Sequence, residues 1–242
     1  MIRKIAVVIA LTTSPMALAD FSAIAPVEWN SWPEYCKAKH LSFGTGGQAF
    51  MERDRARVAQ TDWESLLGDK TWNNIHHGCR GILHIARAER MRGKSQQNYL
   101  YQLGQAESEA NYSFERTPAG HPLYYKMASI LARVDYERGN KGAGIAKLKG
   151  LLKEAPDSAE LHAILAMYLF REGKFDEARR VLENGLETVS EPTAEMHYFL
   201  GLVLVKQQAW EEARKHAAEA YRLGYPLPAL RNKLKAVGHW VE

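Results

Sequence analysis

The sequence has very little of the patterning that marks β-strands. Beyond its first 20 residues, the 242-residue chain contains no alternating run of β-branched residues. A half-buried strand needs polar and apolar residues in alternation, so this absence argues against a sheet. Apolar residues recur instead at spacings of three and four along most of the chain, which is the period of an amphipathic helix. The sequence therefore predicts an all-α fold.

The chain also lacks an excess of charge, a long apolar run and the motifs of common catalytic sites. Lysine and arginine number 32 and aspartate and glutamate 28, a balance that does not indicate a nucleic-acid or anionic membrane partner. Beyond residue 20, no apolar run reaches the roughly 20 residues that a membrane-spanning helix needs. No nucleophile elbow, dinucleotide fingerprint or phosphate-binding loop is present. We expect no cofactor and no enzyme activity.

The first 19 residues have the pattern of a signal peptide. Residues 1–4 include the basic pair Arg3 and Lys4, and residues 5–11 are apolar. Ala17-Leu18-Ala19 is a small-x-small cleavage signal. The apolar stretch is too short to cross a bilayer of roughly 30 Å, which favours cleavage over an uncleaved anchor. The residue directly after the cleavage site is Asp20 and not cysteine, so no lipid anchor is expected. Such a short leader is typical of bacterial export and predicts a periplasmic protein.

Only two cysteines are present, Cys36 and Cys79. In an oxidising compartment an even pair favours a disulfide. The bond would close a loop of about 43 residues and contribute roughly 4 kcal/mol on the loop-entropy model. A buried thiol pair and shared metal ligation are the alternatives.

A repeat organises the C-terminal half of the chain. Its three segments begin near Tyr125, Ala159 and Ala194, 34 and then 35 residues apart. The equivalent positions are Leu131-Ala132, Leu165-Ala166 and Leu200-Gly201; Gly139, Gly173 and Gln208; Lys141, Phe175 and Trp210; and Gly144, Ala178 and Ala213. A fixed period of this length predicts stacked supersecondary units, which rarely catalyse reactions and present a long curved surface to another molecule.

The spacing resembles the tetratricopeptide repeat over roughly residues 125–225. The first segment departs from the family in one place, since Lys141 stands where an aromatic residue is usual. The resemblance implies a helical-hairpin solenoid that acts as a non-catalytic scaffold or adaptor for a protein or peptide. It divides the chain into a signal peptide (1–19), an irregular helical segment (20–70), a degenerate hairpin (71–120), three repeats (121–225) and a capping helix (226–242).

Periodicity and capping signals set the expected helix limits. They predict helices over 33–41, 48–60, 62–67, 71–92 and 95–115, with Gly81 and Ala106 at the crossing of the last two. Three hairpins follow, pairing 122–138 with 141–154, 158–172 with 174–188, and 192–207 with 209–223. A last helix over 227–237 would close the stack with Leu230, Leu234 and Val237 inward.

The resemblance places the first helix of each hairpin on the concave side. The residues it brings there, and which we predict to bind a partner, are Arg133, Tyr136, Met167, Phe170, Arg171, Tyr198, Leu202 and Lys206. An amphipathic helix or extended peptide with some acidic residues would suit such an aromatic trough with a basic rim. Met167 and Tyr198 are equally well explained as core residues. The family's carboxylate clamp is not expected, because Ser129, Ile164 and Glu195 stand where it needs Lys and Asn.

A histidine cluster offers a competing hypothesis of a metal-dependent protein or enzyme. His77, His84, Cys36 and Cys79 could ligate zinc, but their spacing fits no common structural-zinc pattern. We favour histidines, among them His76, packed around the disulfide. The segments Trp32-Pro33-Glu34-Tyr35-Cys36 and His76-His77-Gly78-Cys79 are similar to exported proteobacterial repeat proteins of undefined role. That similarity supports pairing the cysteines and implies no activity.

A third hypothesis is self-assembly. The trough of one copy would receive the N-terminal segment of another, with Trp29 and Trp32 as anchors.

Overall fold

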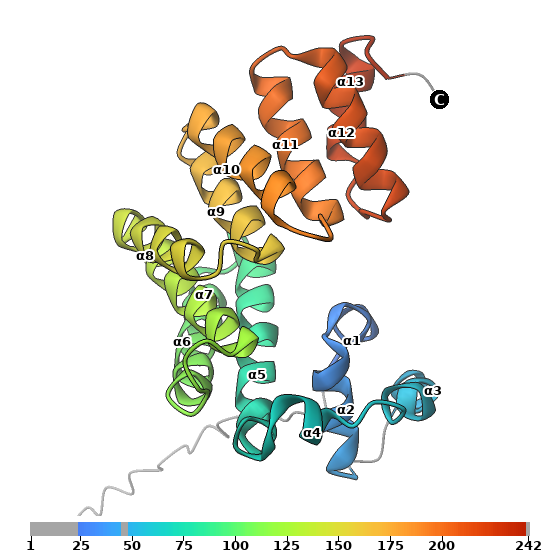
Figure 1. The fold of residues 1–242 in the computed structure, drawn as a ribbon, viewed down its shortest axis with the longest axis vertical. Helices are drawn as coiled ribbons and strands as arrows, with labels where there is room; N and C mark the ends of the chain where they lie inside the picture. Colours follow the sequence, from blue (N-terminus) through green and yellow to red (C-terminus); the bar gives the residue numbers. More distant parts are fainter. Residues whose placement is uncertain (1–23, 45–47, 241–242) are drawn as a thin grey trace, which may run out of the picture. The chain divides into compact units, whose positions relative to one another are not determined.

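The computed structural model is built from helices alone over the residues that it describes, 24–44 and 48–240 (Figure 1). The predicted signal peptide lies outside these residues. Within them the chain forms thirteen helices and no strand, which confirms the all-α fold. None of these helices is long and apolar enough to span a bilayer. The chain divides into two units between Thr61 and Asp62.

The first unit holds α1 (Pro26–Ser31), α2 (Glu34–Ser42) and α3 (Ala49–Val58). Its centre is Trp29, whose ring lies 5.8 Å from that of His40 and 6.3 Å from that of Phe50. The Trp29 indole donates a hydrogen bond of 2.7 Å to Asp54. Trp29 and Trp32 are 0% and 4% exposed. Since buried tryptophans are not available as anchors for another copy, this part of the self-assembly hypothesis was wrong.

The two cysteines form the expected disulfide. Both Cys36, in α2, and Cys79, in α5 (Asp69–Met91), are disulfide-bonded, and the chain has no other cysteine. The prediction of a Cys36–Cys79 bond is therefore confirmed.

The second unit begins with the short helix α4 (Trp63–Leu67), which is capped by Asp62 as the sequence predicts. The long helix α5 then packs against α6 (Gln96–Phe114). The two helices approach closely at Gly81, where an added Cβ would lie 3.2 Å from the Ala110 backbone nitrogen. Ala110 thus takes the crossing position that we assigned to Ala106, which lies one helical turn earlier and is also fully buried.

Three regular hairpins follow, each close to its predicted limits. They are α7 (Pro122–Glu137) with α8 (Lys141–Glu154), α9 (Ala159–Arg171) with α10 (Phe175–Thr188), and α11 (Ala194–Lys206) with α12 (Trp210–Arg222). The small residues at the repeat's crossing positions are all buried: Ala132, Ala166, Gly201, Gly144, Ala178 and Ala213. Small residues let paired helices approach closely, so the repeat period corresponds to one packed hairpin.

The turn inside each hairpin explains one set of equivalent residues. Gly139 and Gly173 have φ of 98° and 72°, and Gln208 has φ of 61°. Each turn thus requires the left-handed backbone region, which glycine enters at little steric cost and other L-residues do not. Among the described residues, Gln208 is alone in adopting positive φ without being glycine.

Replacing Gln208 by glycine is therefore expected to raise the free energy of unfolding by about 1 kcal/mol, because it removes a left-handed non-glycine residue. Urea denaturation followed by circular dichroism would measure it. Gly173→Ala, at the equivalent turn, is the matched control and should lose a similar amount. A destabilised Gln208→Gly protein would contradict the argument.

The helix α13 (Ala229–Ala236) closes the stack. Leu230 and Leu234 are fully buried, as predicted, and a Cβ added to Gly201 would lie 2.5 Å from Leu230 Cδ2. Leu230 therefore covers the last repeat at its small-residue position. Val237 was predicted to face inward, but it is 45% exposed, because the helix ends one residue before it.

Candidate functional site

The first helices of the successive hairpins are α5, α7, α9 and α11. The surface formed by their side chains is here called the first-helix face. Ion pairs join neighbouring helices across it. Glu89 of α5 lies 2.5 Å from Arg133 of α7, and Lys126 of α7 lies 2.5 Å from Glu160 of α9. Lys126, Arg133 and Glu160 belong to first helices, which the resemblance places on the concave side; Glu89 was not assigned to it from the sequence.

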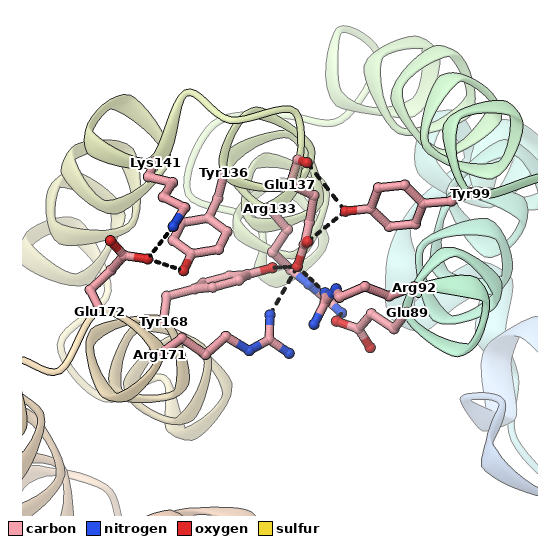
Figure 2. A network of polar contacts seen from close by, with 10 residues as sticks. All are labelled: Glu89, Arg92, Tyr99, Arg133, Tyr136, Glu137, Lys141, Tyr168, Arg171 and Glu172. Carbon is pink, nitrogen blue, oxygen red and sulfur yellow. Dashed lines mark hydrogen bonds and ion pairs between the residues drawn. The ribbon is translucent and has the colours of Figure 1, made fainter. Parts of the chain in front are cut away.

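Glu137, the last residue of α7, is the hub of this face (Figure 2). Only 6% of its side chain is exposed. Its carboxylate accepts hydrogen bonds from the Tyr99 hydroxyl at 2.7 Å, the Tyr168 hydroxyl at 3.3 Å and the Arg171 guanidinium at 2.9 Å. Arg92, directly after α5, also pairs with it. One carboxylate thereby joins side chains from three hairpins.

A layer of aromatic rings lies beside this hub. The rings of Tyr136 and Tyr168 are 4.0 Å apart between centroids, and Arg171 lies over Tyr168. The Tyr136 hydroxyl donates to Glu172 at 2.6 Å, and Lys141 reaches the same carboxylate at 2.9 Å. The lysine that replaces the usual aromatic residue of the repeat thus forms a polar link between the first and second hairpins.

Burial and nearby charge shift several pKa values on this face. Burial raises the pKa of Tyr99 to about 12, and its hydrogen bond to Glu137 acts in the same direction. Burial also raises the pKa values of Tyr136 and Tyr168. Burial lowers the pKa of the Arg133 guanidinium, but the attraction of Glu89, Tyr168 and Glu160 together leaves it raised. Burial raises the pKa of Glu89, but Arg133, Arg171 and Arg92 together leave it lowered. All of these groups keep their ordinary charge at neutral pH.

The predicted partner-binding residues fall into three environments. Arg133, Tyr136 and Arg171 belong to the network just described, with their polar groups engaged inside the chain. Tyr198 is 4% exposed and stacks on Tyr225 with 4.0 Å between centroids, so it is a core residue. The remaining four are accessible: Met167, Phe170 and Leu202 are partly buried, and Lys206 is exposed. Partner binding at these positions stays a prediction.

On the first-helix face, oppositely charged residues one repeat apart pair with each other between the first and second regular hairpins, but not between the second and third. Lys126 pairs with Glu160, and Glu137 pairs with Arg171, in both cases 34 residues apart. At the next repeat the same two positions hold Glu195 and Lys206. In the next repeat, the position of Glu160 is therefore taken by another acid and the position of Arg171 by another base. Within the described ranges, the side chains of Glu195 and Lys206 form no hydrogen bond and no ion pair.

Glu195 lines a cavity of about 450 Å³ at the third hairpin. Its other lining residues are Thr193, Ala194, Gly224, Tyr225, Pro226 and Leu227. Glu195 is exposed. Its partial desolvation still raises its pKa and so does the charge of Glu160, while Arg133 and Lys126 oppose them. The sequence analysis named Glu195 as a departure from the carboxylate clamp and not as a binding residue, although Lys126, Glu160 and Glu195 succeed one another at one register position.

The histidine cluster does not form a metal centre in the described part of the chain. His77 donates to Glu109 at 2.6 Å, and His84 donates to Gln102 at 2.6 Å. Disulfide-bonded cysteines cannot supply the thiolates that a zinc site there would need. No group of three or more His, Cys, Asp or Glu side chains within the described residues could hold a metal ion.

A second cavity, of about 680 Å³, lies beside His77 and is bordered by side chains of α6 and α7. Its acidic groups are already paired: Glu109 with His77, Glu107 with Arg138, and Asp135 with Lys147. A fourth acid of the lining, Glu115, pairs with Arg116, so each acidic group of the cavity already has a partner within the chain.

Comparison with known proteins agrees with this architecture. A family model described as "Tetratricopeptide repeat" matches residues 130–183 and 165–226. A crystal structure of a tetratricopeptide repeat protein from Parabacteroides merdae is similar in fold, with a TM-score of 0.51 and 19% sequence identity. The match covers 82% of this chain and 74% of that one. No curated protein matches the sequence.

Proposed function

Because the chain is a tetratricopeptide repeat protein, with its matched repeats between residues 130 and 226, we propose that it is a non-catalytic scaffold that binds a protein or peptide partner. The partner lies on the first-helix face of the repeats. The leader supports a periplasmic location for this activity, since residues 1–19 have the pattern of an export signal.

One observation carries the proposal. Counted from Tyr125, the ninth and twelfth positions of the first repeat are Arg133 and Tyr136, whose polar groups bind other residues of the chain. The second and third repeats have partly accessible apolar residues at these positions. These are Met167, Phe170, Leu202 and Val205. Apolar and aromatic side chains of this kind act as anchors in protein interfaces, and an amphipathic helix or extended segment fits a groove between helices.

The proposal departs from the sequence analysis in the charge of the partner. We expected an acidic peptide, with Arg133 and Arg171 on the rim. In the folded chain both arginines already have carboxylate partners, Glu89 and Glu137. An acidic peptide would have to displace these ion pairs, so its acidic groups gain little from the two arginines.

Site-specific photocrosslinking in cells tests the function. With a photoreactive phenylalanine analogue at Phe170, we expect one dominant crosslinked species, because this side chain borders the accessible apolar surface. The matched control is Tyr101, which is 46% exposed on α6, a second helix. Mass spectrometry of the adducts would identify the partner. Adducts from Tyr101 with none from Phe170 or Leu202 would contradict the proposal.

A further inference from the structure

The cavity beside Glu195 differs from the rest of the first-helix face because its charge has no counterpart in the chain. Glu89, Glu137 and Glu160 each have a basic partner. Glu195 occupies the same register position as Glu160 but has no lysine or arginine within ion-pairing distance among the described residues. Glu195 is exposed and lines an open hollow, and a carboxylate there without a basic partner can pair with a cation from outside.

We propose that this cavity binds a lysine or arginine side chain of the partner, with Glu195 as its counter-ion. The inference rests on the proposed function and names the chemistry that the third repeat recognises. A basic side chain has an apolar stem and a charged end, and the cavity offers a matching surface for each part.

The apolar part of the cavity is formed by the chain that follows α12. Tyr225 is stacked on the buried Tyr198, so its ring has a fixed orientation. Leu227 is 53% exposed at the edge, and Pro226 lies between them. Aromatic and aliphatic surfaces of this kind pack against the methylene groups of lysine, and a tyrosine ring also attracts its ammonium group.

This wall is held in place before any ligand arrives. The Tyr221 hydroxyl donates to the Leu227 carbonyl at 3.0 Å and accepts from the Arg231 amide at 3.0 Å. The Tyr225 amide donates to the Ala220 carbonyl at 2.9 Å. A preorganised wall lowers the entropy lost on binding.

The charges that face Glu195 agree with a cationic ligand. The neighbouring acids Glu160 and Glu89 favour a positive charge there, while Arg133 and Lys126 are each engaged with one of these acids. The raised pKa of Glu195 means that acidification protonates it earlier than an ordinary glutamate. Binding should therefore weaken as the pH falls from neutrality towards 4.5, the ordinary pKa of glutamate.

Peptide titration of the isotope-labelled mature protein tests the inference. The probes are the blocked pentapeptide Ala-Leu-Lys-Leu-Ala, its arginine form and its norleucine form, which has the stem without the charge. We expect saturable amide shifts at Ala194 and Tyr225 with the two basic peptides. Binding should be at least fivefold weaker with norleucine in the peptide or with Glu195→Gln in the protein.

Glu191→Gln is the matched control, because Glu191 is exposed like Glu195 but does not line the cavity. It should leave the affinity unchanged. Equal binding by wild type and Glu195→Gln, equal binding of the norleucine peptide, or no saturable shift would each overturn the inference. So would an affinity that stays constant between pH 7 and 4.5.

A second arm separates this inference from the proposed function. Crosslinking from Phe170 is repeated in the Glu195→Gln background. If the same partner is captured with undiminished yield, the site at Glu195 is refuted and partner binding stands. If the wild type captures nothing from the first-helix face, the proposed function fails, whatever the peptides show.

Discussion

Replacing Glu137 by glutamine is expected to lower the free energy of unfolding by about 3 kcal/mol. The side chain is 6% exposed and accepts from Tyr99, Tyr168 and Arg171 while also pairing with Arg92. Glutamine keeps the shape but removes the charge, and its amide can accept through only one oxygen. Two guanidinium groups then lose their counter-ion in a poorly solvated site.

Urea denaturation monitored by circular dichroism would measure this loss. Glu211→Gln is the matched control: it makes the same chemical change in a carboxylate that is 67% exposed and lies 3.2 Å from Arg214. An exposed pair contributes at most about 1 kcal/mol. If the two variants lose equal stability, Glu137 is not the hub that its contacts indicate.

The second large effect is expected at Gly144, where alanine should destabilise the protein by about 3 kcal/mol. An added Cβ would lie 2.6 Å from the Ala132 carbonyl oxygen and 2.9 Å from the Tyr136 amide nitrogen. Both atoms belong to the backbone of α7, so no side chain can rotate away. The helices α7 and α8 would have to separate, and the layer of Tyr136 on Tyr168 would move with them.

Gly150 in the same helix provides the control. No atom lies within 4 Å of a Cβ added there, so Gly150→Ala tests helix propensity alone and should stabilise the protein by about 1 kcal/mol. Thermal and urea unfolding of both variants would compare them directly. A neutral or stabilising Gly144→Ala substitution would show that the two helices can move apart at little cost.

The fold was predictable from the sequence because the repeat encodes local packing. Small residues recur where paired helices cross, and Gly139 and Gly173 recur where the turn needs positive φ. Both signals act within a single hairpin, so they fix helix limits to within a few residues. The prediction failed at Val237, where the helix ends, and it did not anticipate α1, a six-residue helix too short to show a period.

The candidate site was predictable only in part, because charge pairing depends on neighbouring units. Glu137 with Arg171 and Lys126 with Glu160 are each 34 residues apart, one repeat, and could have been paired from the sequence. Arg133 instead pairs with Glu89, 44 residues away in the longer, irregular hairpin. No period connects these two, so the sequence made Arg133 look free to meet a partner.

The unmatched charges of the third repeat also have a mechanical consequence. At the junction between the second and third hairpins, the charge of Glu160 acts on Glu195, and the register position of Arg171 holds Lys206 in the next repeat. Elsewhere on the same junction, Arg179 holds Glu212 at 2.8 Å and Gln207 holds Asp176 at 2.7 Å. The third hairpin is therefore joined to the second by these polar contacts, while Glu160 and Glu195 repel each other on the first-helix face. A basic group of a partner that pairs with Glu195 would remove this repulsion, so partner binding would also stabilise the junction between the two hairpins.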